Sequence, residues 1–432
     1  MTQLSKSISK LILLIATGLV CIAAKAQLGQ NVEELVDYET QSNAVSVRSN
    51  ETIKLRHYEI PLRLIEKEIS NRTPEIIKKA LTFEKNGEKY IRWIINPEDT
   101  KWHLEVAQWL KTNKVDAEPK THFEAHMTAS RSYIVRDPET GAEMSMKVST
   151  NQTGGFWKDK KQSWDDAQQT KLAADVVAEM VEKRTPDNFI YLDEPAVFGI
   201  KALDQGMIIR MLGELPSKGK HYIPGFSVLH EEEGKHLAKL NGSDDPAEFW
   251  KEHYIKPLGR GIAELFAMTG LAYDSPHSQN FLVELDNNFK PTGKIVFRDL
   301  GDSYAAQEVI EALGQTKLLK IWERGNMLKG RIMIAQGVLH GNSKPSWISE
   351  KQYNAYGTAF FIEFEKELSR VTAVPLQQLF ADGPFSRSGD YFSKDYSFGG
   401  KSGWSDYLRT IGKTHGLVRS ANSCSVVFST GL

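Results

Sequence analysis

The sequence predicts an α+β fold in which a mostly antiparallel sheet is flanked by helices and followed by a helical C-terminal region. Three observations support this prediction. Two short β-rich runs separated by a turn lie within residues 130–149, three more follow between residues 189 and 212, and long amphipathic patterns lie on either side of this last group. Together they favour a sheet built from short strands.

The composition is that of a globular protein. The 432-residue chain has 41% hydrophobic and 25% charged residues and a formal net charge of -1. A chain of this length can bury a full core and commonly holds about two or three domains. The charge balance argues against a nucleic-acid-binding protein, which would carry a basic excess, and against a disordered chain.

Residues 1–26 have the pattern of a secretory signal peptide. Lys6 and Lys10 precede an apolar run over residues 11–24, and small residues around Lys25 suit signal peptidase. The run is short for a bilayer, which needs about 20 apolar residues, so we favour cleavage over an uncleaved anchor. Cleavage would remove Cys21 and leave Cys424 without an intramolecular partner. We therefore expect an exported protein, periplasmic or secreted, with no stable membrane anchor.

The first half of the mature chain contains several recognisable elements. Helix-like segments occur at residues 61–69 and 74–83. Residues 132–135 and 144–148 predict a hairpin, since a turn rich in Asp, Pro and Gly separates them. A capping pattern at Ser163 begins an amphipathic helix whose apolar stripe reaches residue 181. The runs at residues 189–192, 196–202 and 207–212 are expected to extend the hairpin into a larger sheet.

The second half begins with a strongly marked helix. Asp245 and Pro246 provide its N-terminal signals, and Gly270 provides its end. Residues 281–285 and 294–300 read as two strands joined by a turn-rich linker. After Ser303 the pattern is helical, most clearly at residues 309–338 and 352–368, and the Gly- and Ser-rich stretch from residue 383 reads as loop.

Two basic residues on the first hairpin are candidates for phosphate binding. Arg131 begins the hairpin and Lys147 ends it, so a guanidinium and an ammonium from adjacent strands could stabilise negative charge on a nucleotide. Arg210 ends a later apolar strand, where it could bind a carboxylate or phosphate or form a structural ion pair. The run 158–161 is interpreted as a solvated loop that could add one more cation.

The polar cluster at residues 277–280, together with Arg298 and Asp299, is the other candidate. It combines an imidazole, carboxamides and a carboxylate at the ends of two apolar strands, which suits metal-bound phosphates. Asp299 could ligate Mg²⁺ or cap a turn, and Asn280 favours the metal. The pair His122 and His126 is interpreted as structural.

Taken in order, these motifs resemble the IucA/IucC-type siderophore synthetases, which work independently of nonribosomal peptide synthetases. The resemblance covers roughly residues 128–302 and implies a palm-like sheet with flanking helices. It also implies adenylation of a carboxylic acid by ATP with Mg²⁺, then condensation with an amine or alcohol. We divide the chain accordingly into a signal peptide (1–26), a mixed, helix-rich region (27–120), a nucleotide-binding core (121–303) and a helical C-terminal region with a loop-rich tail (304–432).

The resemblance also implies roles for individual residues. Catalytic roles fall to Arg131, Lys147 and His277, and metal contacts to Asn280 and Asp299. Nucleotide and substrate contacts are expected from the following residues: Ser130, Arg131, Ser132, Lys147, Arg210, Gln279, Asn280 and Asp299. The expected partners are a nucleotide and a small carboxylic acid, without nucleic acid, and a homodimer is left open.

Two alternatives remain open. Lys147 on a strand, Asn280 and the Asp299-Leu300-Gly301 sequence also parallel a kinase-like phosphotransferase, although the chain lacks its glycine-rich loop and its aspartate base. A noncatalytic, exported binding protein on the same fold is the other alternative. Export and altered motifs, such as Met211 in place of the family's glutamate, favour it.

Overall fold

The computed structural model describes residues 28, 30–41, 52–128, 131–153, 158–215, 219–274, 276–319, 326–340, 343–401, 403–407 and 409. The expected signal peptide and Ser130 lie outside these residues. None of the described helices combines the length and the apolar character needed to span a bilayer.

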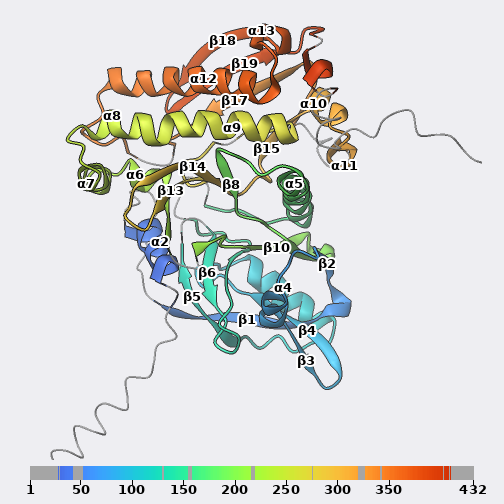
Figure 1. The fold of residues 1–432 in the computed structure, drawn as a ribbon. Coiled ribbons are helices and arrows are strands. Elements are labelled where there is room, and N and C mark those ends of the chain that lie inside the picture. Colours follow the sequence, from blue (N-terminus) through green and yellow to red (C-terminus); the bar gives the residue numbers. More distant parts are fainter. Residues whose placement is uncertain are drawn as a thin grey trace, which may run out of the picture.

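A large antiparallel sheet forms the lower lobe in Figure 1. Its strands run in the order β2-β9-β10-β7-β6-β5-β1-β4-β3, and each neighbouring pair is antiparallel. The strands are β1 (Ile53–Pro61), β2 (Glu66–Ile69), β3 (Thr82–Lys85), β4 (Glu88–Ile94), β5 (Lys120–Met127), β6 (Ser132–Arg136), β7 (Glu143–Lys147), β9 (Ala196–Ile200) and β10 (Gln205–Arg210). The α+β class and the predicted hairpin β6–β7 are confirmed. The sheet continues across residue 120, and the proposed domain boundaries stay predictions.

A second, small sheet lies between the large sheet and the helices of the upper lobe (Figure 1). Its order is β11 (Lys220–Pro224), β13 (Phe281–Asp286), β14 (Pro291–Phe297) and β8 (Phe189–Tyr191). The expected strands at 281–285 and 294–300 are confirmed as β13 and β14. The expectation that residues 189–192 extend the first hairpin is wrong, because β8 pairs in parallel with β14 and Phe189 packs against Phe297 in the core.

Long helices cover the small sheet. In α5 (Trp164–Lys183), the Ser163 side chain accepts a hydrogen bond from the Asp166 amide, as the capping pattern predicts. The second predicted helix starts as α8 (Pro246–Trp250), passes through a π-helical turn (Lys251–Ile255) and continues as α9 (Lys256–Thr269). Gly270 ends α9 with a φ of 74°, a left-handed conformation that glycine adopts without strain.

Helix α12 (Glu350–Thr372) packs along α9 in the upper lobe (Figure 1). Gly259 permits this close approach, because a Cβ there would lie 2.5 Å from the Phe360 carbonyl oxygen. The remaining helices are α2 (Gln30–Gln41), α3 (Glu75–Leu81), α4 (Trp102–Thr112), α6 (Gly225–Val228), α7 (Glu233–Leu240), α10 (Gln307–Ala312), α11 (Thr316–Leu319) and α13 (Leu376–Leu379). Helix α3 confirms the expectation for residues 74–83.

Three local expectations are wrong. Residues 61–69 form a 3₁₀ turn and β2, whose residues pair with β9. Residues 309–338 contain the short helices α10 and α11 and then two strands, because Ile332 and Ile334 alternate with less buried residues, a period-two pattern. Residues 381–397 form a hairpin rather than a loop. The strands of this region are β12 (Leu271–Tyr273), β15 (Ser303–Ala306), β16 (Met327–Leu328), β17 (Arg331–Gln336), β18 (Ala381–Ser388) and β19 (Tyr391–Ser397).

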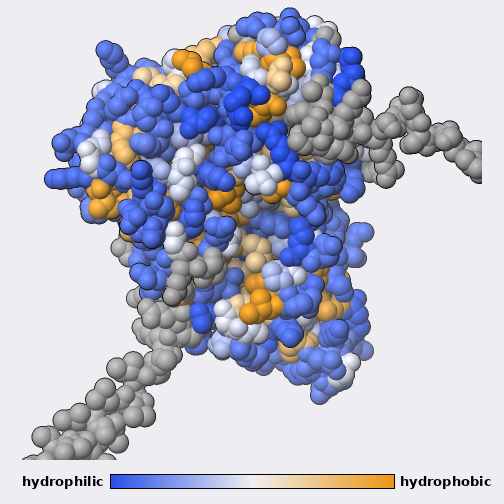
Figure 2. All heavy atoms as spheres, viewed as in Figure 1, coloured by the Kyte–Doolittle hydropathy of each residue, from blue (hydrophilic) through white to orange (hydrophobic). Residues whose placement is uncertain are grey.

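The core has two main parts. One buries the helices α9 and α12 against the small sheet and the C-terminal strands, and the other joins the large sheet to the helices α3 and α4. On the face drawn in Figure 2, hydrophobic residues occur in small groups separated by hydrophilic ones.

Candidate active site between the two sheets

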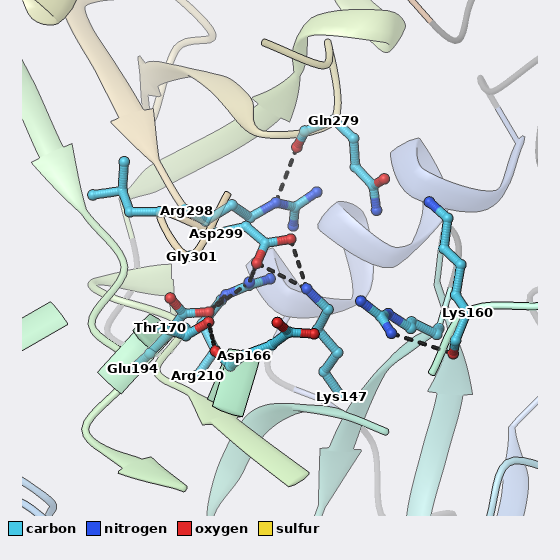
Figure 3. A network of polar contacts seen from close by, with 12 residues as sticks. Lys147, Lys160, Asp166, Thr170, Glu194, Arg210, Gln279, Arg298, Asp299 and Gly301 are labelled. Carbon is cyan, nitrogen blue, oxygen red and sulfur yellow. Dashed lines mark hydrogen bonds and ion pairs between the residues drawn. The ribbon is translucent and has the colours of Figure 1, made fainter. Parts of the chain in front are cut away.

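Lys147 and Asp299 meet between the two sheets. Lys147 is the last residue of β7, and Asp299 follows β14 with a left-handed φ of 64°. The Lys147 ammonium lies 2.8 Å and 2.9 Å from the two carboxylate oxygens of Asp299. Figure 3 shows the two side chains pointing toward one another. The structure thus brings together a cation and a carboxylate that are 152 residues apart in the sequence.

Arg210 lies on the other side of the same carboxylate. Its Nη2 atom is 3.3 Å from Asp299 Oδ1, while its Nε and Nη2 atoms donate to Glu194 Oε1 at 3.0 Å and 2.6 Å (Figure 3). The Tyr191 hydroxyl donates to the second oxygen of Glu194 at 3.0 Å. Arg210, which the sequence left open between ligand contact and ion pair, therefore forms a buried ion pair beside the site.

These contacts perturb the ionisation of the site. Burial alone would raise the pKa of the Asp299 carboxyl, but the charges of Lys147 and Arg210 outweigh burial and hold this pKa well below its usual range. Asp302 lies nearby, and its pKa is raised by burial and by the negative charge of Asp299. Carboxyl groups whose pKa values are pushed apart are typical of functional sites.

Arg131 and Lys160 lie near Lys147 and contact each other. The Arg131 guanidinium donates to the carbonyl oxygens of Lys160 and Lys161 at 3.2 Å and 2.6 Å. Burial lowers the pKa of Arg131 and, together with the charges of Arg131 and Lys147, that of Lys160. Ser132 pairs with Lys147 across the hairpin β6–β7. The predicted cations of the hairpin and the loop therefore lie in one neighbourhood.

The segment 277–280 forms a tight turn before β13. The Gln279 amide donates to His277 Nδ1 at 3.2 Å, and the Asn280 amide donates to the His277 carbonyl at 2.8 Å. Since Nδ1 accepts, the proton of a neutral His277 ring is on Nε2. The His277 ring stacks edge-on against His340, which in turn contacts Tyr391.

The ionisation of His277 leads to a testable prediction. Burial, reinforced by neighbouring His340 and the cations Lys160 and Arg298, lowers the pKa of His277 to about 4 from an ordinary value of 6.5. Folding therefore favours the neutral ring, and this contribution is complete above pH 6.5 and is lost as the pH falls toward 4. Between pH 4 and pH 6.5, we expect the unfolding free energy of the wild type to rise by about 3 kcal/mol more than that of the His277→Asn variant.

Denaturant unfolding of both proteins at several pH values would measure this difference. Parallel pH dependences for the wild type and the variant would contradict a neutral His277.

Magnesium was predicted at Asn280 and Asp299. The described residues contain no group of three or more His, Cys, Asp or Glu side chains placed to hold a metal ion. Both oxygens of Asp299 accept from Lys147, so a metal at this carboxylate would have to displace the ammonium. The arrangement as it stands does not fit a bound metal, and the assignment of these two ligands stays a prediction.

A separate groove of about 1350 Å³ lies on the side of α5 away from Asp166, which faces the site. Its lining includes Lys171 of α5, Tyr191 of β8 and Arg72, which lies between β2 and α3. Arg72 and Lys171 are held in ion pairs with Asp175. We assign the chemistry to the site between the sheets, because the perturbed carboxyl groups and the candidate cations gather there.

Several residues of the site were missed by sequence reasoning. Glu194 precedes a proline between two strands, and this position could have indicated a residue of the site. Nothing in the neighbouring sequence indicates its partner Arg210. Glu39 pairs with Arg298 at 2.6 Å from a helix at the other end of the chain, and His340 lies in a region read as helical. The His122 and His126 pair lies on the strand β5, as a structural reading allows.

Comparison with known proteins supports the fold. No family model and no curated protein sequence matches the chain. The structure is similar to that of the petrobactin biosynthesis protein AsbB from Bacillus anthracis str. Sterne, with a TM-score of 0.50, 13% identity, and coverage of 90% of this chain and 73% of that one. The chain therefore has the fold of the siderophore synthetases.

Two aerobactin synthetases from a hypervirulent pathotype of Klebsiella pneumoniae are similar as well. ATP-bound IucA has a TM-score of 0.48 at 14% identity, over 81% of this chain and 70% of that one. IucC has a TM-score of 0.49 at 12% identity, over 85% of this chain and 64% of that one. The chain thus spans about two thirds of the length of these proteins.

Proposed function

We propose that this protein is an ATP-dependent ligase that activates a carboxylic acid and joins it to an amine or an alcohol. The convergence of Lys147, Arg210 and Asp299 from two sheets is the observation that carries the proposal. Cations held in place before the substrate arrives can stabilise the charge that develops on a transferring phosphoryl group. The siderophore-synthetase fold agrees with this chemistry.

In the proposed reaction, a carboxylate oxygen of the acid attacks the α-phosphorus of ATP. The bond from this phosphorus to the bridging oxygen breaks, and pyrophosphate leaves with the electron pair. Lys147 stabilises the phosphate oxygens, and His277 donates a hydrogen bond from its neutral ring. The amine or hydroxyl then attacks the carbonyl carbon of the acyl adenylate, AMP leaves, and the proton of the nucleophile is released to solvent. Magnesium is proposed to accompany ATP.

Identifying the products from ATP tests the proposal. The chain from residue 27 would be incubated with ATP, Mg²⁺, a panel of di- and tricarboxylic acids and hydroxylamine as a simple nucleophile. We expect AMP, pyrophosphate and a hydroxamate, each dependent on the acid. Formation of ADP in their place would favour the kinase-like phosphotransferase. The pair of Lys147 with Asp299 is also compatible with that alternative. Failure to bind ATP at millimolar concentration would favour the noncatalytic binding protein.

Export is a second part of the proposal. Residues 1–26 would direct the chain to the periplasm or the medium and would then be removed. N-terminal sequencing of the protein recovered from a bacterial host would find Gln27 as the first residue, and an intact Met1 would contradict cleavage. The mass of the purified protein in solution would settle whether it forms a homodimer.

A further inference from the structure

Arg298 is a buried arginine whose hydrogen-bonding capacity is only partly used. Arg298 is only 6% exposed. The Nε atom donates to the Gln279 carbonyl at 3.0 Å and Nη1 donates to Glu39 at 2.6 Å, but Nη2 has no partner among the described residues. Buried polar atoms are rarely left without a partner, so this unpaired guanidinium nitrogen beside the site is a donor that a ligand oxygen could use.

Glu39 fixes the direction of this guanidinium. It lies at the C-terminal end of α2, only 1% exposed, and α2 is attached to the upper lobe by bonds from Asn31 to the Lys220 carbonyl and from Ser227 to the Tyr38 carbonyl. Figure 1 shows α2 beside the small sheet. A buried carboxylate at 2.6 Å leaves a guanidinium little freedom to turn, and so Nη2 is presented in one direction.

Lys160 supplies a second available donor. Its ammonium forms no ion pair with a carboxylate in the part of the chain that the structure describes, unlike Lys147, which is paired with Asp299. Figure 3 shows Lys160 and the Gln279 side chain reaching toward the same region, with the Arg298 guanidinium beside Gln279. Lys160 and Arg298 both lower the pKa of His277, so both charges lie near this ring.

We propose that Lys160 and Nη2 of Arg298 form an oxyanion subsite next to the Lys147–Asp299 pair, with Glu39 as the residue that positions Arg298. The inference rests on the proposed function and adds to it the residues that hold one anionic group of the substrates. A carboxylate of the acid and a phosphate of the nucleotide share the chemistry that two cationic donors recognise. Helix α2 thereby becomes part of the binding machinery.

The experiment measures binding of two probes, citrate and pyrophosphate, by isothermal titration calorimetry. Lys160→Gln removes an ammonium that forms no ion pair with a described carboxylate, so the variant is expected to fold. Lys161→Gln is the matched control, because the Lys161 ammonium is paired with Asp204 at 3.2 Å. We expect Lys160→Gln to weaken the binding of one probe at least tenfold and Lys161→Gln to leave the affinity for both probes unchanged. The probe that is weakened identifies the subsite as carboxylate or phosphate.

Equal binding of both probes by Lys160→Gln and the wild type would overturn the subsite, and so would a wild type that binds neither probe. These outcomes are separate from a failure of the proposed function, in which the wild type binds a probe but forms no pyrophosphate from ATP.

A double-mutant cycle tests the role of Glu39. Glu39 is proposed to position Arg298, which holds the same oxyanion as Lys160. Glu39→Ala alone should therefore weaken binding of the probe about tenfold, and it should weaken binding much less in the Lys160→Gln background. Glu39→Gln keeps an acceptor for Arg298 and should restore most of the binding. Losses that simply add, with a lower melting temperature in every Glu39 variant, would mean that Glu39 only stabilises the fold.

Discussion

Replacing Lys147 with alanine should lower the rate of pyrophosphate formation about 100- to 1000-fold, the cost typical of removing one preorganised donor to a developing oxyanion. The Lys147 side chain is 11% exposed and both of its bonds to Asp299 are short, so it is held in place before any substrate binds. Its loss removes the cation that the ATP phosphates would meet at the end of β7. Acid-dependent pyrophosphate release by the purified variant measures the effect.

Lys171→Ala is the matched control for this substitution. Lys171 is also a buried lysine, with a side chain 4% exposed and ion-paired to Asp175 at 2.6 Å, but it lies on the face of α5 that borders the separate groove. If the loss of any buried lysine pair reduced activity through stability alone, the two variants would behave alike. Full activity in Lys147→Ala would remove this residue from the proposed mechanism.

Replacing Arg210 with methionine should reduce the unfolding free energy by about 3–5 kcal/mol, because the substitution leaves a buried carboxylate without its cation. The partner Glu194 is completely buried, with a side chain 0% exposed, and the Arg210 side chain is 7% exposed. Tyr191 can still donate to Glu194, but a phenol hydrogen bond does not neutralise a charge. The urea midpoint of the unfolding transition, followed by tryptophan fluorescence, measures the loss.

The double variant Glu194→Gln/Arg210→Met isolates the cause. The amide keeps an acceptor for Tyr191 and carries no charge, so most of the lost stability should return. A double variant as unstable as Arg210→Met would point to lost packing around β10 in place of an uncompensated charge. Any remaining loss of activity in the double variant would then report on the contact between Arg210 and Asp299.

Local elements of the fold were predictable where neighbouring residues carry the signal. Ser163 caps α5 and Gly270 ends α9 as expected, since both signals act within one helical turn. The C-terminal strands were missed, because a Gly- and Ser-rich composition in β18 and β19 resembles that of a loop until their pairing with β17 is known. Unlike a helix cap, strand pairing depends on partners far away in sequence, as the pairing of β17 with β19 shows.

The order of the motifs around Lys147, Arg210 and Asp299 was also visible in the sequence, and it led to the synthetase fold that the comparison with AsbB supports. The residues that complete the site were not visible. Glu39 belongs to a region without any chemical motif, and its partner lies 259 residues further along the chain.

The sequence by itself determined the α+β class, the principal helices and hairpins, and the side chains available for phosphate chemistry. These properties follow from periodicity, capping and turn residues, which act over a few positions. Only the tertiary structure decided which charges meet. Burial between two sheets removes water from the side chains, and a buried charge without a partner costs free energy. The pairs of Lys147 with Asp299, Arg210 with Glu194, and Arg298 with Glu39 are the result.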